Sequence, residues 1–202
     1  MIYKVCAYTT NEYYRKLSER LEKSLTKFGL TYHIERIQHP GTWHKAVSLK
    51  PAFIRKMVEE TTLEGVLYLD ADAEVVEPLD FRFFDKYDIS FLEFERAPIS
   101  HSGIEFLTGT MLFRKNEQTL ALLKDWEEKT KLFGISPTPE QDSMKMIFQE
   151  RKHQDVKWVN LDPSWVYIYD DWPKIYKDLK PSIIHYQASR DYRKQERDHV
   201  AS

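Results

Sequence analysis

The chain of 202 residues carries 30 basic and 32 acidic side chains, for a net charge of -2. This balance excludes the strong basic excess of a protein built to bind nucleic acid or anionic lipid. The sequence shows no signal-peptide pattern and no stretch near the ~20 apolar residues that cross a bilayer. We therefore expect one soluble, cytoplasmic domain over residues 1–202, with its single cysteine, Cys6, buried and unpaired.

Two β–α units are predicted at the start of the chain. The apolar run at residues 2–8 is typical of a strand, and Asn11 can cap the helix that follows. Apolar residues recur every three or four positions until Gly29, which ends this helix. A second strand at residues 32–37 leads into a polar and aromatic loop at residues 38–45. The apolar face of the helix is formed by Tyr14, Leu17, Leu21, Leu25 and Phe28.

Pro51 indicates the start of the next helix, because proline suits the first helical position and keeps the preceding residue out of helical geometry. Lys50 then stands at the N-terminus of this helix, where the helix dipole disfavours a cation unless an anion is also present. A bound phosphate would supply that anion. The alternative is a lysine whose ammonium group reaches solvent, and the sequence leaves both open.

An apolar strand at residues 66–69 ends in two aspartates, Asp70 and Asp72. An unbroken apolar run of this length is typical of a strand buried on both faces of a parallel sheet. Ligands of open α/β sheets bind beyond the carboxyl ends of the strands, so both carboxylates would lie in the ligand crevice. Two oxygen donors at this spacing can hold Mg2+ or Mn2+. The alternative is a solvated acidic turn.

The middle of the chain is predicted to contain a strand at residues 88–94, a polar loop at residues 96–106 and a glycine-bearing turn that enters a strand at residues 107–113. Gly109 in this turn favours either a β-bulge or a backbone that closely approaches a ligand. Asn116 can cap the helix that follows.

Thr138 and the proline after it predict the start of a helix that runs to about Gln149. The pattern is that of a capping box, which gives Glu140 and Gln141 structural roles. Asp142 has no such role in the box. It is either a catalytic acid or an acid that the helix dipole favours in the first turn.

The last third of the chain is predicted to contain a strand at residues 157–161 and a turn that aims Trp165 outward. The aromatic and acidic run at residues 167–172 would line an acceptor groove or cover the edge of the sheet. A final strand at residues 182–184 delivers His185. A lone histidine is more often structural than a ligand, so its role stays open at this point.

Four features, taken in order, resemble glycosyltransferases of the GT-A fold. They are Leu-Asp-Ala-Asp at residues 69–72, Thr-Gly-Thr at residues 108–110, Pro-Glu-Gln-Asp at residues 139–142 and His185. More closely, they resemble the small nucleotide-diphospho-sugar transferases, and the resemblance covers nearly the whole chain.

This resemblance implies an α/β fold, in which helices flank a mixed, mainly parallel, Rossmann-like sheet. The sugar-nucleotide-binding half would span about residues 1–80 and the acceptor-side half about residues 81–190. The implied reaction is a metal-dependent transfer of a hexose from a nucleotide-diphosphate sugar, with a UDP-sugar as the expected donor. In such enzymes Mn2+ or Mg2+ bridges the two phosphates and neutralises charge on the leaving group.

The resemblance also implies roles for single residues. Asp70 would contact the ribose or the metal, Asp72 would be a direct metal ligand, and His185 would be a further metal or diphosphate contact. Glu140 or Asp142 would lie near the reacting centre. The donor would be bound by Ala7, Tyr8 and Thr9 at the nucleobase, Lys50 at the nucleotide, and Gly109 and Thr110 at the sugar.

The sequence departs from one well-known family pattern, in which the final histidine begins an HxxGxxKPW segment. Here His185 begins His-Tyr-Gln-Ala-Ser-Arg. The lysine that would grip the diphosphate is missing, so Ser189 or Arg190 would take its place. Trp165 and the tyrosines after it would face the acceptor.

Two other functions remain open: a non-catalytic module that binds sugar nucleotides or glycans, and a Mg2+-dependent phosphohydrolase. The acceptor is not identified and could be a saccharide, a protein, a lipid-linked precursor or a modified DNA base. The last would need basic side chains beside the cleft, and the near-neutral charge does not favour it. The candidates for such a strip are Lys145, Arg151, Lys152, Arg190, Arg193 and Lys194.

Overall fold

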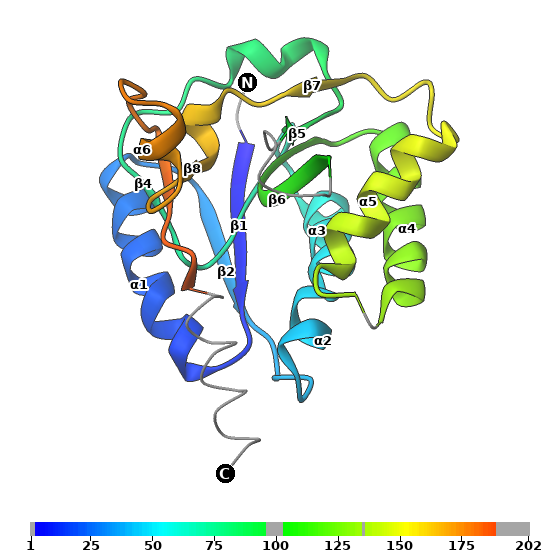
Figure 1. Ribbon diagram of the computed structural model, residues 1–202, viewed down its shortest axis with the longest axis horizontal. Coiled ribbons are helices and arrows are strands. Elements are labelled where there is room, and N and C mark those ends of the chain that lie inside the picture. The colour runs from blue at the N-terminus through cyan, green and yellow to red at the C-terminus, as the bar shows by residue number, and fades with distance from the viewer. Residues whose placement is uncertain (1–2, 96–102, 135, 189–202) are drawn as a thin grey trace.

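The computed structural model describes residues 3–95, 103–134 and 136–188 (Figure 1). Its main sheet has six strands in the order β2-β1-β3-β6-β5-β7. β1 is parallel to β2 and β3, β5 is parallel to β7, and β6 is antiparallel to β3 and β5. The predicted α/β class with a mixed, mainly parallel sheet is confirmed. The strands are β1 (Tyr3–Thr9), β2 (Tyr32–Arg36), β3 (Gly65–Leu69), β5 (Ile89–Glu95), β6 (Ile104–Arg114) and β7 (Trp158–Asn160).

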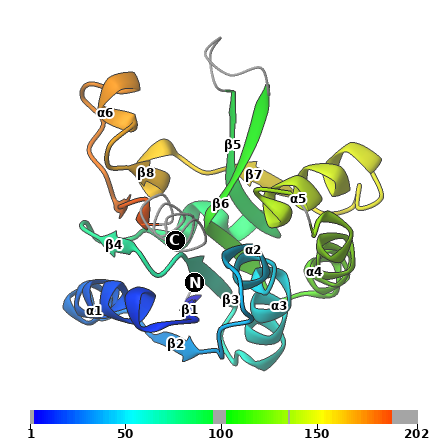
Figure 2. The same ribbon diagram turned by 60° about the horizontal axis from the view of Figure 1, so that its bottom comes forward.

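β3 is buried along its whole length, as its apolar run predicts. Val66 and Tyr68 point into one hydrophobic cluster, and Leu67 and Leu69 point into another on the opposite face. Figure 2 shows α3, α4 and α5 on one side of the sheet and α1 on the other. The helices are α1 (Glu12–Lys27), α2 (Trp43–Val47), α3 (Lys50–Glu60), α4 (Glu117–Thr130) and α5 (Pro139–Glu150).

A second sheet has three strands in the order β4-β9-β8. β4 (Ala73–Val75) is antiparallel to β9 (Ile183–His185), which is parallel to β8 (Tyr167–Ile168). A short helix, α6 (Trp172–Ile175), follows. Of these three strands only β9 was predicted, from the apolar residues that precede His185. Glu74 interrupts β4, and β8 has only two residues, so neither shows an apolar run.

Of the turn and the strand predicted at residues 107–113, only the strand is present. These residues belong to the continuous strand β6, because pairing with β3 continues through Leu69 and Thr110. The same strand already begins at Ile104, inside the loop predicted at residues 96–106. Residues 96–102 of that loop lie outside the described part of the chain.

Two other local predictions are also wrong. The loop at residues 38–45 contains the start of α2, which Thr42 caps by accepting a hydrogen bond from the Lys45 amide at 3.3 Å. Trp165 lies in a 3-10 helix, η3 (Pro163–Val166), and packs edge-on against Phe81 and Phe84 at ring-centre distances of 5.8 and 5.2 Å. Its ring therefore packs on other aromatic side chains and does not point outward.

Two predictions about the whole chain can be compared with the structure. Cys6 is fully buried, and burial raises the pKa of its thiol well above the ordinary value. Within residues 3–95, 103–134 and 136–188, none of the helices has the length and apolar character that a membrane span needs.

Candidate functional site

A cavity of about 280 Å3 opens beyond the carboxyl ends of β1 and β3, where the sequence placed the ligand crevice. It lies along the seam between the main sheet and the small sheet, because strands of both sheets contribute lining residues. Both sheets, α1, α2, α3 and α5 contribute to its wall. Its polar and aromatic lining includes Tyr8, Thr10, Tyr14, Trp43, Lys50, Tyr68, Asp70, Asp72, Glu105, Thr108, Thr138, Glu140, Gln141, His185 and Gln187.

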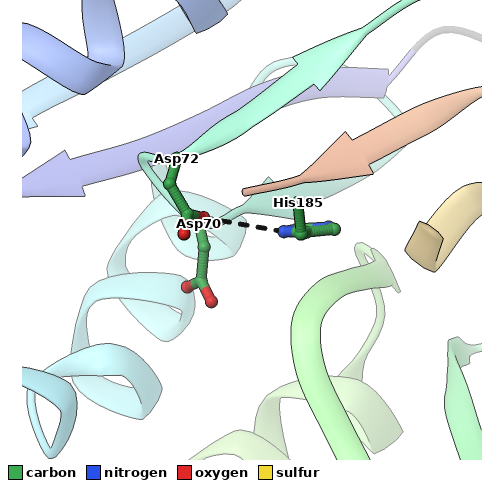
Figure 3. Close-up of side chains that lie close together, drawn as sticks. All are labelled: Asp70, Asp72 and His185. Atoms are coloured by element: carbon green, nitrogen blue, oxygen red, sulfur yellow. Dashed lines mark ion pairs between the residues drawn. The ribbon is translucent and has the colours of Figure 1, made fainter. Parts of the chain in front are cut away.

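Three potential metal ligands meet on one wall of this cavity. Asp70 follows β3, Asp72 precedes β4 and His185 ends β9. Pairing of Ala73 with His185 brings the histidine to the acidic turn. One ligand atom from each of the three side chains lies within 4.8 Å of the other two (Figure 3). The sequence prediction that these three residues come together is therefore matched by their placement.

The carboxylate of Asp72 is held from two sides. Its Oδ2 accepts a hydrogen bond from the Ala188 amide at 2.8 Å, and its Oδ1 lies 3.8 Å from His185 Nδ1. Burial alone would raise the pKa of Asp72, but interactions that include the hydrogen bond from the Ala188 amide and the positive charge of Lys50 outweigh it and lower that pKa. Asp72 is thus kept in the ionised form that a metal ligand requires.

Asp70 has one oxygen engaged, and the other lies beside Gly109. Tyr68 donates its hydroxyl proton to Asp70 Oδ1 at 2.7 Å, and Lys50 Nζ lies 3.0 Å from the same oxygen. A methyl group on Gly109 would lie 3.1 Å from Asp70 Oδ2 and 3.3 Å from His185 Nδ1. The glycine therefore keeps open the space that these two donors face. Carboxylate oxygens and an imidazole nitrogen around such a space fit a divalent cation.

Lys50 is only 3% exposed, so the alternative in which it reaches solvent is wrong. Its ammonium group donates hydrogen bonds at 3.2 Å to the carbonyl and the hydroxyl of Thr108. It also lies 3.0 Å from Asp70 and 3.8 Å from Glu140. The anions that compensate this cation are thus two carboxylates of the protein itself.

Glu140 is not a capping residue, because its side chain points into the protein and is 4% exposed. Thr138 makes no side-chain cap for α5. Glu140 Oε1 accepts a hydrogen bond from the Thr108 hydroxyl at 3.4 Å, and Oε2 has no hydrogen-bond partner among the described residues. Burial raises the pKa of Glu140, although Lys50 acts in the opposite direction. Glu140 is therefore a buried acid beside the cavity, and its Oε2 is buried without a hydrogen-bond partner among the described residues.

Gln141 and Asp142, the residues after Glu140 in α5, do not have the positions that their predicted roles require. Gln141 lines the cavity. The carboxylate of Asp142 instead accepts hydrogen bonds from the hydroxyls of Ser136 and Thr138, in the loop before α5. The sequence did not indicate Gln141 as a site residue, because the capping-box pattern already gave it a structural role.

The predicted nucleobase segment is only partly in the wall. Tyr8 lines the cavity and donates its hydroxyl proton to the Ala46 carbonyl at 2.8 Å. Ala7 and Thr9 are 0% and 3% exposed and pack behind the wall, while Thr10 lines it. Ser189 and Arg190 lie outside the described residues.

Three aromatic residues of the wall were missed as site residues. Tyr14 was interpreted only as part of the apolar face of α1, and Tyr68 only as part of the buried strand β3. Trp43 belongs to the loop in which α2 was not predicted. For Trp43, the aromatic and polar composition of that loop was the signal that could have indicated a site residue.

Comparison with solved structures shows the fold. The fold is similar to that of a glycosyltransferase involved in the glycosylation of the major capsid of PBCV-1, with a TM-score of 0.67 and 18% identity over 97% of this chain and 98% of that one. It is also similar to the glycosyltransferase GlyE of Streptococcus pneumoniae TIGR4, with a TM-score of 0.56 and 19% identity over 92% of this chain and 55% of GlyE. These likenesses show a glycosyltransferase fold.

The sequence identifies the family. The family model for nucleotide-diphospho-sugar transferases matches residues 11–198, so the chain belongs to this family and is a glycosyltransferase. No individual curated protein matches the sequence. The resemblance stated from the four motifs is confirmed.

Proposed function

We propose that this glycosyltransferase transfers a hexose from a UDP-sugar in a reaction that requires Mn2+ or Mg2+. One observation carries the proposal: Asp70, Asp72 and His185 place three ligand atoms within 4.8 Å of one another on the wall of the cavity. A divalent cation held by these three side chains would neutralise charge on the diphosphate leaving group. Membership of the nucleotide-diphospho-sugar transferase family supports this donor class.

The residues around the ligands have complementary roles in this proposal. Lys50 holds Asp70 in place and adds a positive charge near the phosphates. Tyr8 borders the nucleobase, and Gly109 lets the donor approach the sheet closely. Glu140 lies at the sugar and the reacting centre. It is a better candidate than Asp142, because Glu140 lines the cavity whereas Asp142 does not and instead bonds the hydroxyls of the loop before α5.

The acceptor is the least constrained part of the proposal. The similar PBCV-1 enzyme is involved in the glycosylation of a viral capsid, which favours a protein-linked glycan over a modified DNA base. The net charge of -2 agrees with this preference. The described residues Lys145, Arg151 and Lys152 lie on or just after α5 and do not line the cavity.

The test is hydrolysis of a panel of nucleotide sugars without acceptor, with Mn2+, with Mg2+ and with a chelator. We expect slow release of UDP that needs the metal and falls at least a hundredfold in Asp72→Asn. Asp155→Asn, an exposed aspartate after α5, is the matched control and should behave as the wild type.

Two outcomes would contradict the proposal. Tight binding of UDP without turnover of any donor or acceptor would indicate a binding module. Release of phosphate from a simple aryl phosphate, with every nucleotide sugar left intact, would indicate a phosphohydrolase.

A further inference from the structure

Thr110 is a fully buried residue of β6, and its hydroxyl joins two elements that are far apart in sequence. The hydroxyl oxygen lies 2.7 Å from His185 Nε2 and 2.9 Å from the carbonyl oxygen of Trp165. The histidine belongs to the small sheet and the tryptophan to η3. Thr110 therefore connects the main sheet to one of the candidate metal ligands.

The direction of both hydrogen bonds follows from elementary chemistry. A carbonyl oxygen only accepts, so the Thr110 hydroxyl must donate its single proton to Trp165. The contact with His185 can then form only if Nε2 carries a proton and donates it to the Thr110 oxygen. The remaining ring nitrogen, Nδ1, is the one that faces Asp72 Oδ1, at 3.8 Å.

We propose that Thr110 is a positioning residue that keeps the proton of His185 on Nε2 and directs the lone pair of Nδ1 toward the cation. This inference rests on the proposed metal-dependent function. A histidine can bind a metal only through an unprotonated nitrogen, and the partner of the other nitrogen decides which one that is. With the opposite tautomer, an N–H bond would point at the space between Asp70 and Asp72.

The Trp165 carbonyl, which accepts the hydrogen bond from Thr110, is itself held in place. The Ser164 carbonyl accepts a hydrogen bond from the Ser182 amide at 2.8 Å, which ties η3 to the start of β9. The Trp165 ring packs on Phe81 and Phe84. Because the carbonyl of Trp165 cannot turn away freely, it fixes the hydroxyl of Thr110 and, through it, the ring of His185.

This role differs from the one that the family resemblance implied, in which Thr110 contacts the donor sugar. The hydroxyl is completely buried, and its single proton is already committed to Trp165. Neighbouring Gly109, by contrast, lines the cavity. The structure thus separates a glycine in the cavity wall from a threonine behind it.

The experiment compares Thr110→Val, which keeps the shape but removes the hydroxyl, with Thr110→Ser, which restores it. Thr119→Val is the matched control, because Thr119 is equally buried and lies at the start of α4. The first measurement is the 15N NMR spectrum of histidine-labelled, metal-free protein in alkaline buffer, with His185 assigned through His185→Gln. The second is Mn2+ affinity, followed by electron paramagnetic resonance of the free ion.

We expect the Nε2-protonated tautomer in the wild type, Thr110→Ser and Thr119→Val, and a shift toward the Nδ1-protonated tautomer in Thr110→Val. We expect Mn2+ affinity to fall about 10- to 100-fold in Thr110→Val and to recover in Thr110→Ser. A wild type with the proton on Nδ1, or a folded Thr110→Val with unchanged tautomer and affinity, would overturn the inference. Failure of UDP-sugar turnover would contradict the proposed function alone, because neither measurement uses a donor.

Discussion

The two sheets of this protein contribute to the site in different ways. The main sheet is covered on both faces, and the strands at its centre lie between two hydrophobic clusters. The small sheet consists of strands of only two or three residues, and its edge strand β4 is tied to α1 by the Val75 amide, which donates to the Ser24 hydroxyl at 3.1 Å. The main sheet places Asp70, whereas the small sheet and the turn before it place His185 and Asp72. Assembly of the metal ligands therefore depends on how the small sheet docks.

This comparison predicts that changes on the main-sheet side cost stability, whereas changes at the seam cost ligand binding. The largest effect is expected for Lys50→Ala. This substitution leaves Asp70 and buried Glu140 without their cation, and breaking a buried pair in this way costs about 3 kcal/mol of unfolding free energy. Urea denaturation measures it.

Lys56→Ala is the control for Lys50→Ala, because Lys56 pairs with Glu35 at an exposed position on the same helix. Its unfolding free energy should stay within about 0.5 kcal/mol of the wild type. Equal stability of the two variants would show that the buried pair does not support the main-sheet side.

A seam residue gives the second prediction. In Gly109→Ala the added methyl group would lie 3.1 Å from both Asp70 Oδ2 and His185 Cε1. We expect Mn2+ affinity to fall about tenfold, comparable to loss of a supporting residue around a metal site, while the unfolding free energy changes by less than about 1 kcal/mol. Calorimetric titration with Mn2+ and urea denaturation measure the two quantities.

Gly134→Ala is the matched control, since a methyl group there would meet nothing within 4 Å and the backbone is helical, with φ of -56°. It should leave Mn2+ affinity unchanged. A Gly109→Ala variant that binds Mn2+ like Gly134→Ala would mean that the cation does not occupy the space between Asp70 and His185.

The same difference between the sheets explains what the sequence could predict. The central strands of the main sheet are long enough to show an apolar run, and β3 pointed directly to Asp70 and Asp72. His185 was found because an apolar run also precedes it. The strands β4 and β8 gave no such signal, because Glu74 interrupts the apolar residues of β4 and β8 has only two residues.

The predicted roles of single side chains were wrong where a local sequence pattern suggested one role and a contact with a residue distant in sequence determined another. Lys50 finds its acceptor at Thr108, 58 residues away, which no local pattern reports. Glu140 fitted the pattern of a capping box, but its side chain is buried next to that of Lys50. Helix α5 begins with a proline and has no side-chain cap. Glu140 is instead buried beside the ammonium group of Lys50. Tertiary contacts thus decided both positions.

The smallest expected effect is a change in how stability depends on pH in Glu140→Gln. Burial raises the pKa of Glu140 above its ordinary value of 4.5, so the folded protein holds this proton more tightly than the unfolded chain does. Stability from this group is complete below the unfolded pKa and is lost as the pH rises through the folded pKa. Glutamine cannot lose a proton, so Glu140→Gln should gain stability relative to the wild type as the pH rises above 4.5.

Urea denaturation at a series of pH values measures this difference between the wild type and Glu140→Gln. Glu128→Gln is the control, because that side chain is 61% exposed and should leave the wild-type curve unchanged. If Glu140→Gln instead loses stability steadily as the pH rises, the ionised carboxylate stabilises the fold through Lys50. Lys50 and Glu140 would then form an ordinary buried salt bridge, and Glu140 would not be a protonated acid on the main-sheet side of the cavity.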